Sequence, residues 1–315
     1  MILGHERQIK YFDRVIAAGR LAHAYLLYGP ERVGKRAMAY AIARVLLCPQ
    51  YAGNSQSIAS AGDDCRVCRE ISAGTHPGLI ALDPRHPLVP PKGVHDETLI
   101  DDIRELKHRF SFAPIAGAWR IAIIDDTDRM SADAEVSFLK LLEEPGAQTV
   151  FLLIASSRDA VPPTIVSRAM PILFAPVPDR VLAPYVRKHL PKENRENMLA
   201  LARGRAGMIA EWVQNPERLA EEKKNAALFS SVFVGGMADM LALSEKAMQD
   251  EVMRRRIQDA WIAYLRRRLT VAAGAERIDV ACRITRALDI ISVIEDTNIN
   301  TRLAMDVMFA EGSVK

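Results

Sequence analysis

Hydrophobic and polar residues alternate along the first half of the chain in two distinct patterns. Apolar residues spaced three and four apart predict amphipathic helices, whereas short unbroken apolar runs predict buried strands. The helical pattern covers residues 5–18, 35–47, 96–110 and 132–143. The apolar runs are 24–28, 79–82, 120–125, 150–155 and 171–174. Strands that alternate with helices in this way are typical of a parallel sheet with helices on both faces.

The second half of the chain follows only the helical pattern. Beyond Pro178, amphipathic segments continue without a strand signal of comparable strength. We therefore expect one α/β domain followed by two all-helical domains. They are an α/β domain over residues 1–178 with a Cys-rich insertion at 48–76, a small helical domain over 179–216 and a larger helical domain over 217–315.

Composition places the chain among ordinary soluble proteins. Lys and Arg number 42 and Asp and Glu 39, and the net charge of +3 is too small to indicate nucleic-acid binding by electrostatics alone. No apolar run is long enough for a membrane span, and the N-terminus lacks the apolar core of a signal peptide. Four cysteines, two of them spaced as Cys65-x-x-Cys68, favour a metal site over a disulfide framework. These features predict a cytoplasmic protein.

The segment between the first apolar run and the next helix has the spacing of a phosphate-binding loop. Gly29 is followed by four residues and then by Gly34 and Lys35. In such a loop, backbone N–H groups and the helix N-terminus hold the phosphates of a nucleotide, and the lysine contacts the terminal ones. The residue after the lysine is normally Ser or Thr, whose hydroxyl binds Mg²⁺, but here it is Arg36.

The apolar run at 120–125 ends in acids that complete the pattern of a nucleotide site. Asp125 occupies the position of the carboxylate that holds Mg²⁺, and Asp126 that of an acid, often Glu, that orients the attacking water. Each element alone also fits a Gly-rich turn or a buried strand that ends in solvated acids; together they favour a nucleotide-binding ancestor. Arg36 introduces a cation near the metal position, and Asp126 is shorter than Glu. We therefore expect weak or no ATP binding, and no hydrolysis.

Several segments together resemble the clamp-loader AAA+ proteins, and most of all the delta-prime family of bacterial DNA polymerase III. They are residues 21–35, 73–77, 119–145, 162–169 and 298–309. The resemblance implies a RecA-like AAA+ domain, a helical lid and a helical collar through which the subunits of a ring assemble. In that ring, motor subunits hydrolyse ATP, a further subunit opens the clamp, and the delta-prime subunit is a rigid stator. The implied partners are these subunits, the sliding clamp and primed DNA.

The resemblance also implies roles for residues outside the nucleotide loop. Arg168, in the segment Ser167-Arg168-Ala169, matches an arginine finger that acts in trans on the ATP site of a neighbouring subunit. A surface arginine after a helix is the alternative interpretation of Arg168. Gly207 falls where the lid of active members carries an arginine that senses the γ-phosphate, and Arg205 is out of register with it.

Three cysteines resemble the zinc module that this family carries as an insertion. They are Cys48, Cys65 and Cys68. The family has a further cysteine at the position of Gly62. Because structural zinc is coordinated tetrahedrally, three thiolates are not enough, and His76 or an acid such as Asp63 would have to complete the site. The alternative is a set of reduced cysteines that bind no metal.

Two other functions fit parts of the sequence. The first is a motor-type clamp-loader ATPase whose unusual loop still hydrolyses ATP. The second is a stand-alone nucleic-acid-associated AAA+ protein such as a helicase loader, which would need a basic face of its own. The arginine triplets at 254–256 and 266–268 are better explained as solvated positions or as salt bridges between subunits, and the small net charge also argues against this second function.

Overall fold

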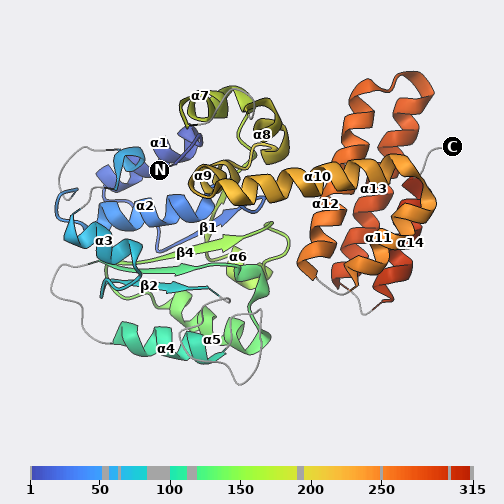
Figure 1. Ribbon diagram of the computed structural model, residues 1–315. Helices are drawn as coiled ribbons and strands as arrows, with labels where there is room; N and C mark the ends of the chain where they lie inside the picture. Colours follow the sequence, from blue (N-terminus) through green and yellow to red (C-terminus); the bar gives the residue numbers. More distant parts are fainter. Residues whose placement is uncertain are drawn as a thin grey trace. The chain divides into compact units, whose positions relative to one another are not determined.

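Figure 1 shows the computed structural model of the chain. The residues that it describes are 2–51, 57–62, 65–83, 100–111, 119–189, 195–248, 251–296 and 299–312. The chain divides into two compact units, Met1–Gln214 and Asn215–Lys315. The first unit combines a sheet with helices, and the described part of the second is helical, so the predicted fold class is confirmed. No helix within the described ranges is long and apolar enough to cross a bilayer.

The sheet of the first unit consists of parallel strands in the order β2-β3-β4-β1-β5. Their bounds are β1 Ala24–Tyr28, β2 Leu79–Leu82, β3 Arg120–Ile124, β4 Thr149–Ala155 and β5 Met170–Leu173. Each strand coincides with an apolar run that predicts a strand. Because all the strands run in the same direction, the residues that follow β1, β2 and β3 meet at one edge of the sheet, where ligands bind in folds of this kind.

Strand β1 shows why the apolar runs are unbroken. Tyr25 and Leu27 belong to the core on one face of the sheet, and Ala24 and Leu26 to the core on the other. All four side chains are almost completely buried. A strand that is covered on both faces has no polar side, so its sequence shows no alternation.

Helices cover both faces of the sheet (Figure 1). In the described part of the first unit they are α1 Glu6–Ala17, α2 Lys35–Leu47, α3 Arg66–Ser72, α4 Ile100–Ser111, α5 Ala132–Glu143, α6 Pro163–Val166, α7 Asp179–His189, α8 Arg195–Ala202 and α9 Ala206–Gln214, with short 3₁₀ turns η1 Ile58–Ser60 and η2 Thr127–Arg129. Helices α1, α2 and α3 pack on one face, and α4, α5 and α6 on the other. The helix predicted over 96–110 is α4, and residues 96–99 lie outside the described part of the chain.

The described residues of the second unit form a helical bundle with its own core. Its helices are α10 Pro216–Gly235, α11 Met237–Ala247, α12 Glu251–Val271, α13 Gly274–Asp296 and α14 Thr301–Gly312. Trp261 is fully buried, and its ring lies 4.9 Å from that of Phe233 and 5.3 Å from that of Phe309, measured between centroids. Trp261, together with Ile257 and Leu265 on the same helix α12, therefore lies at the centre of this core. Residues 298–309, which resemble the closing helix of the clamp-loader family, correspond largely to α14.

Candidate functional site

The predicted phosphate-binding loop lies between β1 and α2. Gly29 has a φ of 140°, and a Cβ atom at this position would lie 2.1 Å from the carbonyl oxygen of Phe174, so only glycine fits. Gly34 has a φ of 125° and precedes the first turn of α2. Both glycines thus adopt backbone conformations that side chains disfavour. The strand, loop and helix follow one another as the motif requires.

Lys35 is buried within the loop to which it belongs. Only 6% of the residue is exposed, and its Nζ donates hydrogen bonds to the carbonyl oxygens of Gly29 and Pro30, the latter at 2.9 Å. Burial lowers the pKa of Lys35, and the negative charges of Asp125 and Asp128 oppose this shift. The lysine therefore donates to backbone carbonyl oxygens and interacts electrostatically with nearby carboxylates of its own chain.

Arg36 joins the ends of two neighbouring strands. Its Nη1 atom lies 2.8 Å from Oδ2 of Asp83, directly after β2, and 3.2 Å from Oδ2 of Asp125, directly after β3. The guanidinium also lies 5.7 Å from the ring centroid of Tyr40. Burial alone would lower the pKa of Arg36, but the hydrogen bonds to Asp83 and Tyr40 outweigh this effect and raise the pKa. The cation is thus bound to the very carboxylate that the sequence assigns to Mg²⁺.

Asp83 was not among the site residues predicted from the sequence, although its position directly after a buried strand could have indicated it. Leu82 of β2 pairs in register with Ile124 of β3, so the acids that follow the two strands come out side by side. The backbone N–H of Asp125 also donates to the carbonyl oxygen of Leu82 at 2.9 Å. An acid directly after one buried strand is unremarkable; two such acids after adjacent strands form a pair that needs a cation.

Asp126 begins the turn η2 in a left-handed conformation, with a φ of 47°. Its backbone N–H donates to Oδ1 of Asp125 at 3.2 Å, so both carboxylate oxygens of Asp125 are engaged, one by this N–H and the other by Arg36. Nearby, Oδ2 of Asp128 accepts a hydrogen bond from the backbone N–H of Ser156 at 3.0 Å. The carboxylates of Asp125 and Asp128 are therefore held in contacts within the protein.

The helical segment that resembles a lid packs directly against the loop. The backbone N–H of Gly207 donates to the carbonyl oxygen of Arg32 at 2.7 Å, and a Cβ atom at Gly207 would lie 2.6 Å from the same oxygen. The side chain of Arg32 forms an ion pair with Glu211 of α9 at 2.9 Å. Glycine at 207 is therefore required by packing. An arginine there, as in active members of the resembled family, would push α9 away from the loop.

Arg168 lies directly after Ser167, which ends the short helix α6, and is partly exposed. Its Nη2 atom lies 2.7 Å from Oε1 of Glu143, and its Nη1 atom donates to the carbonyl oxygen of Thr164 at 3.0 Å and to Oγ of Ser167 at 3.2 Å. The following residue, Ala169, is buried in the core shared by α4, α5 and α6. The guanidinium is thus held at the surface by acceptors from two helical segments.

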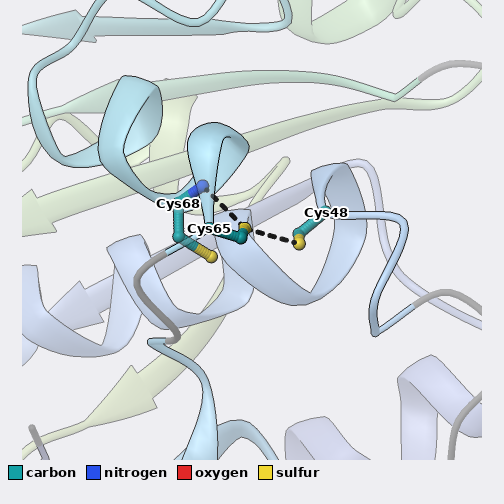
Figure 2. A group of neighbouring side chains, drawn as sticks. All are labelled: Cys48, Cys65 and Cys68. Carbon is teal, nitrogen blue, oxygen red and sulfur yellow. Dashed lines mark hydrogen bonds between the residues drawn. The ribbon is translucent and has the colours of Figure 1, made fainter.

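The three predicted zinc ligands come together at the end of α2 and the start of α3 (Figure 2). Their sulfur atoms all lie within 4.8 Å of one another, and those of Cys48 and Cys65 are 3.5 Å apart. Two ligands of a tetrahedral zinc ion with bonds of about 2.3 Å are about 3.8 Å apart, so this donor set fits zinc in both chemistry and spacing. The backbone N–H of Cys68 lowers the pKa of Cys65, whereas burial raises the pKa of Cys68 to about 12.

The suggested fourth ligands are not brought to the thiols within the described residues. His76 is not part of the cluster there, and its Nδ1 atom accepts a hydrogen bond from the backbone N–H of Gly78 at 3.1 Å. Gly62, where the family has a cysteine, adopts a φ of 149° that a cysteine would rarely adopt. Asp63 lies outside the described residues.

The strand order, the glycine loop after β1 and the acids after β3 define a RecA-like AAA+ domain, here followed by helical segments. A family model described as "DNA polymerase III, delta subunit" matches residues 4–178, which is more than half of the chain. The chain belongs to this family.

Individual relatives agree with this assignment. The DNA polymerase III subunit delta' of Pseudomonas aeruginosa is 34% identical over 187 residues, which cover 58% of this chain and 53% of the relative. That of Bacillus subtilis is 32% identical over 189 residues, with the same coverage of 58% and 53%. The subunit tau of Salmonella typhimurium is 27% identical over 247 residues, covering 78% of this chain and 32% of the relative. The match thus spans about half the length of these two delta' relatives.

Proposed function

We propose that this protein is a stator subunit of delta-prime type in a clamp loader of the DNA polymerase III holoenzyme. In this role it does not hydrolyse ATP itself. It holds the ATPase subunits in place and donates Arg168 to the ATP site of a neighbour. The observation that carries the proposal is the bridge that Arg36 forms between Asp83 and Asp125.

The bridge opposes hydrolysis for an electrostatic reason. A Mg²⁺ ion at this site needs the carboxylate of Asp125, and it would have to displace a guanidinium that already forms ion pairs with both acids. The loop also lacks the hydroxyl ligand for the metal, because Arg36 stands in its place. The lid adds a third deficiency, since Gly207 supplies no side chain to contact a γ-phosphate. Metal binding and charge stabilisation would both be impaired.

The proposed partners are the motor and clamp-opening subunits, and through them the sliding clamp and primed DNA. The exposed position of Arg168 supports a role for it outside its own chain. In the second unit, apolar side chains on the described helices support its assignment as the collar that joins subunits. The most exposed of them are Val271 at 83%, Ile278 at 69% and Leu303 at 62%.

The proposal predicts that the isolated protein shows no Mg²⁺-dependent ATP turnover. The measurement is steady-state hydrolysis by purified protein, compared with a Lys35→Met variant that keeps the aliphatic stem but removes the ammonium. Both should give the same background rate. Turnover that disappears in the variant would favour the alternative of a motor-type ATPase, because only a working loop depends on its lysine. Nucleotide that binds without being hydrolysed would remain compatible with a stator.

We further propose that Cys48, Cys65 and Cys68 hold a structural zinc ion, with a fourth ligand outside the described residues. Zinc would supply a cross-link between α2 and α3 and take no part in the loading reaction. Protein purified without chelators should contain about one zinc per chain. Cys48→Ser and Cys65→Ser should lose it, whereas His76→Ala should retain it.

The matched control is Cys282→Ser, since Cys282 is an exposed cysteine in the second unit. It should leave the zinc content unchanged. Elemental analysis of these variants decides the question. Far less than one zinc per chain in the unsubstituted protein would mean that the thiols bind no metal, and the proposed stator role would be unaffected.

A further inference from the structure

The contacts of Arg168 come from two separate parts of the chain. Two acceptors, the carbonyl oxygen of Thr164 and Oγ of Ser167, belong to the segment that carries the arginine, residues 163–168, which we call the α6 segment. The third, Glu143, is the last residue of α5. Its carboxylate supplies the shortest of these contacts, at 2.7 Å. A residue distant in sequence thus determines where the guanidinium points.

Helix α5 holds the α6 segment at a second point. Oγ1 of Thr164 donates to Oε1 of Glu135 at 2.5 Å. Glu135 and Glu143 are two turns apart and therefore lie on the same side of α5. The neighbouring residues Leu142 and Ile165 are buried in one core. These contacts thus hold the α6 segment against α5, while the side chain of Arg168 remains 37% exposed.

We infer that Glu143 is a positioning residue for Arg168, an inference that rests on the trans-acting role proposed above. An exposed arginine has many rotamers, and holding one of them restricts its conformational freedom. A carboxylate bound to Nη2, together with two acceptors on Nη1, fixes the planar guanidinium before a neighbour's nucleotide reaches it. Catalytic groups that are already aligned lower the barrier, and a displacement of about 1 Å can cost on the order of a hundredfold in rate.

The test uses the reconstituted clamp loader with wild-type motor subunits, and it measures kcat and KM for ATP in the presence of clamp and primed DNA. Glu143→Ala should lower kcat at the site that Arg168 serves by about tenfold and leave KM for ATP unchanged, because the alignment matters in the transition state. Glu143→Gln keeps an oxygen acceptor and should recover most of the loss. Glu144→Ala, which removes the adjacent exposed carboxylate, is the matched control and should have no effect.

A double variant separates positioning from a general effect on the fold. When Arg168 is already alanine, Glu143→Ala should cause no further loss, since the two residues act as one unit. If Glu143→Ala does not assemble, Glu143→Asp replaces it: the shorter side chain keeps the charge but falls short of the guanidinium, and kcat should drop.

Three results would overturn the inference. The first is an unchanged kcat in Glu143→Ala, or in Glu143→Asp where that variant replaces it. The second is a raised kcat, which would mean that the carboxylate restrains the arginine. The third is an equal loss with and without Arg168. Failure of the underlying proposal looks different: in that case Arg168→Ala itself leaves turnover unchanged, and both the finger and its positioning are overturned.

Discussion

Replacing Arg168 with alanine is expected to lower the ATP turnover of a reconstituted clamp loader while the ring still assembles. The guanidinium would complete a neighbour's ATP site, and an arginine finger in trans can be worth on the order of a thousandfold at the site that it serves. The total loss is diluted by other sites that still work. Stability should change little, because a partly exposed ion pair such as that of Arg168 with Glu143 contributes at most about 1 kcal/mol.

Two further variants sharpen this prediction. Arg168→Lys should rescue turnover poorly, since lysine lacks the planar fork that spans phosphate oxygens. Arg158→Ala removes another exposed arginine from the segment between β4 and α6 and should behave like the wild type. The readouts are ATPase stimulated by clamp and DNA, and gel filtration to check assembly. Unchanged turnover by an intact ring that carries Arg168→Ala would remove this residue from the neighbour's site.

Replacing Arg36 with threonine should make the stability of the protein depend on Mg²⁺. The change removes the cation from two acids of low exposure and is expected to lower the free energy of unfolding by about 1–3 kcal/mol, less than for a fully buried pair because the Arg36 side chain is 47% exposed. It also restores the hydroxyl that a phosphate-binding loop uses to bind the metal. Mg²⁺ at ten times its dissociation constant would then return about 1.4 kcal/mol.

The measurement is chemical or thermal unfolding with and without Mg²⁺. The wild type should show no response, because its own guanidinium occupies the position between Asp83 and Asp125 and pairs with both. Arg44→Thr is the control: this arginine lies on the same helix but hydrogen-bonds to Ser72, and its loss should not create a response to Mg²⁺. Equal Mg²⁺ effects on the wild type and on Arg36→Thr would show that Arg36 does not take the place of the metal.

The sequence alone predicted the framework of the first unit well, for identifiable reasons. Strands such as β1 are buried on both faces and appear as unbroken apolar runs. The glycines of the loop have positive φ values that other residues rarely adopt. Gly29 and Gly34 therefore carry a signal that is local in the chain. The thiols of Cys48, Cys65 and Cys68 were also predicted together, and the structure places them within 4.8 Å.

What the sequence missed depends on contacts between distant segments. The pairing of Arg36 with Asp83 follows from the register of β2 against β3, which no local pattern reveals. Glu143 is 25 residues from Arg168, so their contact could not be read from spacing. Gly207 was taken as a missing arginine, whereas the structure gives it a positive role: only glycine allows α9 to approach the loop so closely.

The two alternative functions can now be weighed against particular observations. A motor-type ATPase would have to function with a guanidinium on Asp125 and a glycine in its lid, as described above. A stand-alone nucleic-acid-associated protein such as a helicase loader is disfavoured by membership of the DNA polymerase III family over residues 4–178. The proposed stator role would rely on Arg168 and would not require the nucleotide site.

The most direct test of the stator role compares two variants within the same reconstituted clamp loader. Lys35→Met disables the phosphate-binding loop of this chain. Arg168→Ala leaves that loop intact and removes only the arginine proposed to act at a neighbour's ATP site. The measured quantity is ATP turnover stimulated by clamp and primed DNA, in rings shown by gel filtration to be complete. We predict full turnover with Lys35→Met and a clear loss with Arg168→Ala. A loss with Lys35→Met and full turnover with Arg168→Ala would contradict the account and identify this chain as a motor.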